Sequence, residues 1–289
     1  MKTAHSIGPV GIGLLTWLGV LVGAAIWLAR SPRSDGRIAR VASKGFGTAA
    51  TWLRQWIGVE ATAIVGLALG LGVAMVLGLG STMVLEDVLE GEGWAELDEP
   101  AARWLAANRE PWLTSALLVV TRMGDPARQT LWMMVVCAVA TVCSRSLLPA
   151  VLGAVGGGGI GLVILTAKHL VGRERPHLPS AVLTVDGFSF PSGHAAGAAA
   201  VGTVGAWILC RWVVHRWAAR VGAWAATIGV VMLIGFSRAY LGVHYVTDVL
   251  AGWLVGTAWA AAVIVVASWW TFARNGYGVT GATERRNAI

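Results

Sequence analysis

Six ionisable side chains stand at the ends of long apolar stretches in the C-terminal half of the sequence. They are Lys168, Arg175, His194, Arg238, His244 and Asp248. Ionisable groups at membrane depth are costly, and they indicate function by default. Three cations in a partly desolvated site suit an anion that spreads its charge over several oxygens, and phosphate is the obvious choice.

The run Pro191-Ser192-Gly193-His194 has the residues of a phosphate-binding turn. Pro191 and Gly193 shape a turn, and a helix is predicted to begin near His194. Backbone N–H groups at a helix start have no intrahelical partner and can point at an anion. Gly193 allows a phosphate to approach closely, Ser192 adds a hydroxyl donor, and His194 is placed to protonate a leaving oxygen.

His244 and Asp248 are spaced i, i+4, so they share one face if the last helix begins near His244. The carboxylate can then bond one ring nitrogen and leave the other nucleophilic. Covalent catalysis follows: imidazole attacks phosphorus, His194 protonates the leaving group, and water later releases phosphate.

Each group alone also has a structural interpretation, as an interfacial cation, a helix cap or an i, i+4 pair. Their common position at one end of several predicted helices favours the functional one.

The composition is that of a membrane protein. The chain has 289 residues, of which 56% are hydrophobic and 13% charged, with a mean hydropathy of +0.68. Soluble domains carry about 25% charged residues. The net charge of +7 fits cytoplasmic loops that face anionic headgroups, so no nucleic-acid partner is expected. The 3 scattered cysteines form neither a disulfide framework nor a metal-ligand pair.

Seven apolar runs are each near the ~20 residues that cross the hydrocarbon layer. They cover residues 8–29, 61–85, 129–147, 149–169, 195–214, 221–237 and 248–271. The predicted fold class is therefore all-α, a polytopic transmembrane helical bundle. Its predicted parts are an N-terminal helix with a basic linker (1–60), a six-span core (61–271) and a short cytoplasmic tail (272–289).

Charge asymmetry orients this predicted bundle. Basic residues collect in the linker after the first span, in the loop after the fifth and in the tail, whereas residues 86–99 are acidic. Seven spans place the three basic segments on one side, and the positive-inside rule makes that side cytoplasmic. The N-terminus is then outside. The six ionisable groups all face the non-cytoplasmic side of the cell membrane.

Three motifs carry a family resemblance. They are Lys168-six residues-Arg175-Pro176, then Pro191-Ser192-Gly193-His194, then Ser237-Arg238-five residues-His244-three residues-Asp248. Together they resemble the three-part signature of the type 2 phosphatidic acid phosphatase superfamily, which includes lipid phosphate phosphatases and, more distantly, soluble vanadium haloperoxidases. The resemblance covers about residues 61–271, because the family core has six spans. Residues 97–126 are also similar to the family's amphipathic segment before the second core span.

The resemblance implies a role for each residue of the signature. His244 would become the phosphohistidine, Asp248 would orient it, and His194 would be the general acid. The family is generally metal-independent and the sequence has no metal-ligand cluster, so neither a metal nor a cofactor is expected. The groups that would hold the phosphate oxygens are Lys168, Arg175, Arg238, Ser192 and the Gly193 amide.

The sequence thus predicts an integral-membrane phosphatase that acts on a lipid phosphate or diphosphate at the outer face. Phosphatidic acid, phosphatidylglycerol phosphate and a polyprenyl diphosphate are all open as substrates, and the oligomeric state is open too. A channel or transporter is the second hypothesis, but it would carry charges or broken helices near the midplane of several spans. A vanadate-dependent, haloperoxidase-like enzyme is the third, and the membrane spans argue against it.

Some expectations concern residues outside the signature. Leu97–Asn108 is expected along the outer interface, with Leu97, Trp104 and Leu105 towards lipid. Gly153–Gly161 lies in an apolar span without a following Lys-Ser/Thr pair, which indicates close helix packing rather than a nucleotide loop. The histidines expected to be interfacial rather than catalytic are His169, His177 and His215.

Overall fold

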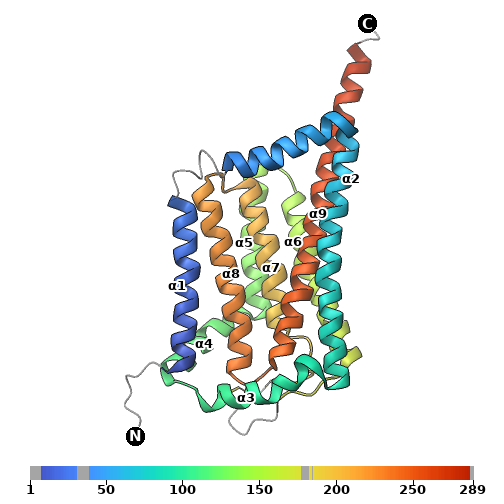
Figure 1. Cartoon of the computed structure of the whole chain (residues 1–289). Coiled ribbons are helices and arrows are strands. Elements are labelled where there is room, and N and C mark those ends of the chain that lie inside the picture. Colours follow the sequence, from blue (N-terminus) through green and yellow to red (C-terminus); the bar gives the residue numbers. More distant parts are fainter. Residues whose placement is uncertain (1–7, 31–38, 177–181, 184, 287–289) are drawn as a thin grey trace.

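The computed structural model describes residues 8–30, 39–176, 182–183 and 185–286, and it is a bundle of helices (Figure 1). Residues 31–38 of the predicted basic linker and His177 lie outside the described residues. A short 3-10 helix, Gly93–Leu97, precedes α3. The α-helices are α1 Pro9–Arg30, α2 Ala39–Glu90, α3 Asp98–Ala107, α4 Pro111–Met123, α5 Pro126–Ser144, α6 Leu148–Val171, α7 Gly193–Trp212, α8 Trp217–Tyr240 and α9 Val246–Arg286.

The predicted membrane spans are confirmed in number and approximate position. The described chain has 7 helical segments long and apolar enough to cross a membrane: Pro9–Ala29, Ile64–Glu90, Pro126–Ser144, Leu148–Val171, Gly193–Trp212, Trp217–Tyr240 and Val246–Thr271.

The segments next to the spans are more helical than the sequence indicates. Helix α2 begins at Ala39, within the predicted linker, and α9 runs on to Arg286 through most of the predicted tail. In Figure 1 the first part of α2 lies across the end of the bundle opposite α3 and then turns to run beside α9. The predicted division at residues 60 and 271 therefore does not coincide with helix ends.

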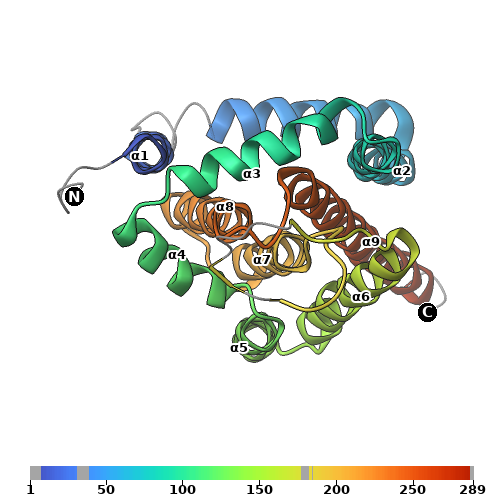
Figure 2. The same ribbon diagram turned by 90° about the horizontal axis from the view of Figure 1, so that it is seen from below.

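Helix α7 is the centre of the bundle. Seen from the end in Figure 2, it is surrounded by α5, α6, α8 and α9. Helix α9 approaches it closely through glycines. A Cβ atom on Gly252 would lie 2.8 Å from the Ser192 carbonyl oxygen, and one on Gly256 would lie 2.3 Å from that of Ala196. Glycine is therefore required where α9 brings Asp248 beside the start of α7.

Helix α3 lies across one end of the bundle, between α1 and α2 (Figure 2). The side chains of Leu97 and Trp104 are 56% and 51% exposed, as expected for residues that face lipid. The expectation for Leu105 is wrong: it is buried in a cluster with Leu113 and Tyr240. The apolar stripe of α3 therefore divides between the protein core and the outside.

Candidate active site

The structure brings all the predicted site residues to the end of the bundle that α3 crosses. Lys168 comes from the last turn of α6 and Arg175 from the loop that follows. The Ser192-Gly193-His194 run forms the start of α7, since Ser192 is its N-cap and Gly193 its first residue. Arg238 lies in the last turn of α8, His244 in the next turn of chain, and Asp248 in the first turn of α9.

His244 and Asp248 form a buried pair. The two side chains are 3% and 0% exposed, and His244 Nδ1 lies 3.4 Å from Asp248 Oδ2. One part of the prediction needs correction: α9 begins at Val246, so His244 lies in the turn before the helix rather than on it. The turn still brings the ring over the carboxylate, because the Tyr245 N–H donates to Asp248 Oδ2 at 2.9 Å.

Ser189 is a third member of this pair that the sequence did not indicate. Its hydroxyl donates a hydrogen bond to Asp248 Oδ2, and its Oγ lies 3.2 Å from His244 Nδ1. Ser189 is fully buried and stands two residues before Pro191. The only signal in the sequence is a polar residue between two phenylalanines.

The environment of His244 favours a neutral imidazole with an unprotonated Nε2. Burial lowers the pKa of His244 to about 4, although Asp248 acts in the opposite direction. With Nδ1–H directed at the carboxylate and Ser189, Nε2 carries the lone pair. A guanidinium nitrogen of Arg175, Nη1, lies 3.2 Å from that Nε2. The predicted nucleophilic atom and a predicted phosphate-binding cation are thus in direct contact.

The predicted phosphate-binding cations are held by backbone oxygens and one hydroxyl. The Lys168 ammonium donates to the Phe188 carbonyl. Arg175 donates to the carbonyls of Gly187 at 2.9 Å and Val243 at 2.8 Å. Burial lowers the pKa of Arg175, although Asp248 and Asp186 act to raise it. Lys168 and Arg175 thus meet at the Phe188 carbonyl, and Arg175 also contacts His244 Nε2.

Arg238 and Ser192 each bring an unsatisfied polar atom to the site. Arg238 is 3% exposed, and its Nη1 donates to Thr121 Oγ1 at 2.8 Å. Within the part of the chain that the structure describes, the buried Arg238 Nε and Ser192 Oγ have no hydrogen-bond partner. Buried polar atoms are almost always paired, so these two call for an explanation. Phosphate oxygens would satisfy both.

His194 faces a carboxylate. Its Nε2 lies 3.1 Å from Asp125 Oδ1, and Asp125 is the N-cap residue of α5. The sequence did not indicate Asp125. The pair fixes the imidazole at the start of α7, where the predicted acid must stand.

Arg173 and Asp98 also lie beside the predicted site and were not predicted to belong to it. Arg173 Nη1 donates to Asp248 Oδ1 at 2.7 Å, and its Nη2 donates to Asp98 Oδ2 at 2.8 Å. Arg173 falls between Lys168 and Arg175 in the first motif, where its cation is not part of the signature.

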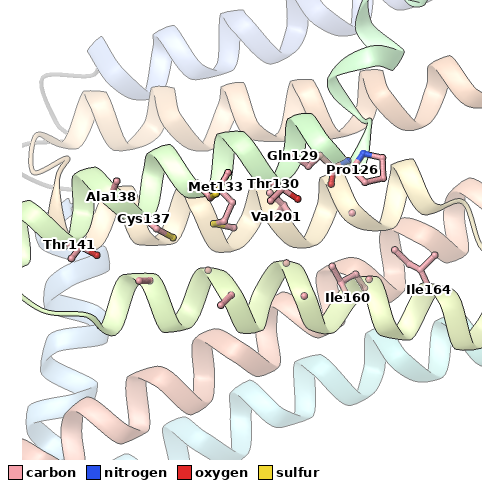
Figure 3. Close-up of a pocket in the computed structure, with 18 of the residues that line it drawn as sticks. Pro126, Gln129, Thr130, Met133, Cys137, Ala138, Thr141, Ile160, Ile164 and Val201 are labelled. Atoms are coloured by element: carbon pink, nitrogen blue, oxygen red, sulfur yellow. The ribbon is translucent and has the colours of Figure 1, made fainter.

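An apolar groove of about 850 Å³ opens beside the phosphate-binding turn. It runs between α5 and α6 with α7 behind it (Figure 3). Pro126, Ile164 and Gly193 line it at the site end, and Thr141 and Val142 line it near the other end of α5. The groove therefore joins the predicted site to the hydrocarbon-facing side of the bundle.

The glycine-rich run of α6 has two uses. Gly156 and Gly159 pack closely, since a Cβ atom on them would lie 3.2 Å from Val204 and 2.1 Å from Trp259. Gly153 also packs closely, since a Cβ atom there would lie 2.2 Å from Cys137 Sγ. The expected helix packing is confirmed for these three. The glycines of the run that line the groove are Gly153, Gly157, Gly158 and Gly161.

A metal site is not evident in the described part of the chain. No group of three or more His, Cys, Asp or Glu side chains is placed there to hold a metal ion. Metal independence stays a prediction.

A polytopic helical bundle with these side chains at one end is what a membrane-embedded phosphatase would need, and comparison with known proteins points to the same class. Residues 135–272 match the model of the PAP2 superfamily, in agreement with the family resemblance of the three motifs. It is 28% identical over 174 residues to phosphatidylglycerophosphatase B of Bacillus subtilis (strain 168), covering 60% of this chain and 85% of that protein.

A solved structure agrees with this assignment. The crystal structure of a transmembrane PAP2-type phosphatidylglycerolphosphate phosphatase from Bacillus subtilis matches with a TM-score of 0.61 at 25% identity. The match covers 66% of this chain and 94% of that one. The predicted fold class and the predicted resemblance to the family are confirmed.

Proposed function

We propose that the chain hydrolyses the terminal phosphate of a lipid phosphate or diphosphate, without a metal, through a phosphohistidine at His244. The observation that carries the proposal is the setting of the His244 ring. Nδ1 lies 3.2 Å from Ser189 Oγ and 3.4 Å from Asp248, while Nε2 lies 3.2 Å from the Arg175 guanidinium. A nucleophile oriented by a carboxylate and aimed at a cation suits attack on an anionic phosphoryl group.

The proposed reaction has two displacements at phosphorus. In the first, His244 Nε2 forms a bond to phosphorus, the bond from phosphorus to the lipid oxygen breaks, and His194 gives its proton to that oxygen. In the second, His194 takes a proton from water, the water oxygen bonds to phosphorus, and the phosphorus–nitrogen bond breaks. Lys168, Arg175 and Arg238 balance the charge on the equatorial oxygens in both steps.

The groove between α5 and α6 supports a lipid substrate. From Ala150 to Ile164 it follows α6 over 14 residue steps, which is about 21 Å at ~1.5 Å per residue. That is roughly two-thirds of the ~30 Å hydrocarbon layer. A hydrocarbon chain that lies there leaves its phosphate beside Gly193. The names of the relatives make phosphatidylglycerol phosphate the first substrate to test, with phosphatidic acid and a polyprenyl diphosphate beside it.

We place the active site on the non-cytoplasmic face of the cell membrane. The acidic residues Glu86–Glu99 lie at the site end, whereas Arg211, Arg216 and Arg220 lie around the α7–α8 turn at the other end. The positive-inside rule assigns the basic end to the cytoplasm.

The test is phosphate release from the three lipids by the purified protein in detergent, with His244→Ala beside it. We expect His244→Ala to lower kcat by several orders of magnitude, because it removes the nucleophile. His215→Ala is the matched control, since this exposed imidazole lies in the α7–α8 turn at the opposite end. Substantial phosphate release by His244→Ala would exclude the phosphohistidine.

The same preparation separates the alternative functions. Bromide oxidation by peroxide in the presence of vanadate would indicate the haloperoxidase-like enzyme. Solute uptake into proteoliposomes without phosphate release would indicate a transporter.

A further inference from the structure

Asp248 is a buried carboxylate with a buried cation on its far side. The Asp248 side chain is 0% exposed, and one of its oxygens, Oδ2, is used by Ser189, Tyr245 N and His244. The other oxygen, Oδ1, accepts from Arg173 Nη1 at 2.7 Å. An ionised carboxylate in such a place is costly unless an opposite charge and hydrogen bonds compensate it. Arg173 supplies both.

Arg173 is itself held in place from three sides. Its Nη2 forms an ion pair with Asp98 Oδ2 at 2.8 Å, and the Asp98 side chain is 2% exposed. Its Nη1 also donates to Thr247 Oγ1 at 2.8 Å, while the Tyr245 ring lies 4.4 Å below the guanidinium. Thr247 in turn donates to Asp98 through its N–H, at 3.0 Å, and through its hydroxyl. The planar fork of an arginine presents donors to two carboxylates in one fixed geometry, whereas a lysine offers a single flexible ammonium.

The two carboxylates beside Arg173 set its charge state. Burial acts to lower the pKa of Arg173, but the carboxylates of Asp248 and Asp98 outweigh it and raise that pKa. Arg173 thus stays charged at any working pH. The titratable and charged groups that face Arg173 or Asp248 are Asp98, Glu99 through the Tyr245 hydroxyl, Tyr245, His244, Lys168 and Arg175.

We infer that Arg173, anchored by Asp98, is a positioning residue that keeps Asp248 ionised and oriented so that it holds Nδ1–H of His244. The inference rests on the proposed function, because it assigns how the nucleophile of that reaction is prepared. Arg173 acts through Asp248 and does not touch the phosphate. Asp98, which anchors Arg173, lies at the start of α3 and outside the range of the superfamily match.

The test compares Arg173→Gln, Arg173→Lys and Asp98→Asn with wild type. Phosphate release from phosphatidylglycerol phosphate micelles gives kcat and KM, and inhibition by orthovanadate reports the phosphate-binding cations separately. We expect Arg173→Gln to lower kcat by about 10- to 100-fold, as for other residues that orient a reacting side chain. KM and the vanadate inhibition constant are expected to change less than about threefold.

Two further readouts distinguish positioning from a purely structural role. The acid limb of kcat/KM is expected to move to higher pH in Arg173→Gln, because a buried carboxylate without its cation takes up a proton more readily. Arg173→Lys keeps the charge and is expected to recover part of kcat, so it carries the test if Arg173→Gln does not fold. The Asp98→Asn/Arg173→Gln double variant is expected to be about as slow as Arg173→Gln, since both changes act on one contact.

The matched control is Arg103→Gln on α3. Arg103 is 67% exposed at its side chain and pairs with Glu99 at 3.9 Å, so wild-type kcat is expected. An unchanged kcat in Arg173→Gln would overturn the inference, and so would a vanadate constant that rises as much as kcat falls, because Arg173 would then bind phosphate. If wild type releases no phosphate from any lipid, the proposed function itself fails.

Discussion

Gly256→Ala tests whether the distance between α7 and α9 sets the geometry of the active site. Gly256 lies two turns after Asp248 and faces the first turns of α7. A Cβ atom there would lie 2.3 Å from the Ala196 carbonyl oxygen and 2.9 Å from the Ala199 Cβ, whereas ordinary contact begins near 3.4 Å. The two helices must therefore separate by about 1 Å. That movement displaces His194 from the His244–Asp248 pair.

The expected loss of activity is larger than the expected loss of stability. A misplacement of about 1 Å in a reacting group costs on the order of 100-fold in rate. Overpacking costs roughly 1–3 kcal/mol, and alanine in place of glycine within a helix returns about 1 kcal/mol. We therefore expect Gly256→Ala to fold, to unfold within a few degrees of wild type, and to lose about 100-fold in kcat/KM.

Gly222→Ala is the control for this prediction. Gly222 is an exposed residue of α8, and a Cβ atom there meets nothing within 4 Å. Wild-type kcat/KM and equal or slightly higher thermal stability are expected. Phosphate release and thermal unfolding in the same detergent measure both variants. A folded Gly256→Ala protein with near wild-type kcat/KM would refute the claim that this contact sets the site geometry.

Three other predictions concern the metal, pH and sidedness. Activity is expected to survive excess EDTA; complete loss with EDTA that magnesium restores would refute the metal-free mechanism. Burial lowers the pKa of His244 to about 4, from about 6.5 in the unfolded chain. The contribution of His244 to the free energy of unfolding is therefore complete above about pH 6.5 and falls towards pH 4. In His244→Asn, the free energy of unfolding measured in urea is expected to depend less on pH over that window. Sidedness can be tested with single cysteines in a cysteine-free protein, labelled in intact cells with an impermeant maleimide. Glu92→Cys is expected to react and Ser146→Cys is not, since the two exposed positions lie at opposite ends of the bundle. The reverse pattern would place the site on the cytoplasmic face.

The membrane spans and the three motifs could be predicted because each depends only on residues that are close together in the sequence. A transmembrane helix needs only length and apolar composition. The motifs around Lys168, His194 and His244 each stand at a helix end, and α-helical bundles bring such ends together. The start of α9 at Val246 shows the limit of this reasoning, because a spacing of four residues cannot distinguish a helix from a turn that leads into one.

The partners of the candidate catalytic groups could not be predicted because they come from distant positions. Asp98 and Arg173 are 75 residues apart, Thr121 and Arg238 are 117 apart, and Asp125 and His194 are 69 apart. No periodicity or spacing connects such pairs. The prediction that Leu105 faces lipid is wrong for a related reason. An amphipathic stripe shows that a helix face is apolar, but only packing decides whether that face meets lipid or protein.

Three of these partners, Asp98, Thr121 and Asp125, nevertheless come from one segment, which runs from α3 to the start of α5. Thr121 holds the buried Arg238, and Asp125 faces His194. Asp125 is also followed directly by Pro126, which lines the groove at the site end together with Gly193. Under the proposed function, a lipid in the groove would bring its phosphate-linked oxygen to the side of the site where His194 stands, while His244 stands beside Arg175 in the turn before α9. An in-line displacement at phosphorus would require the proposed acid and nucleophile to be separated in this way, since the leaving oxygen departs opposite the attacking nitrogen.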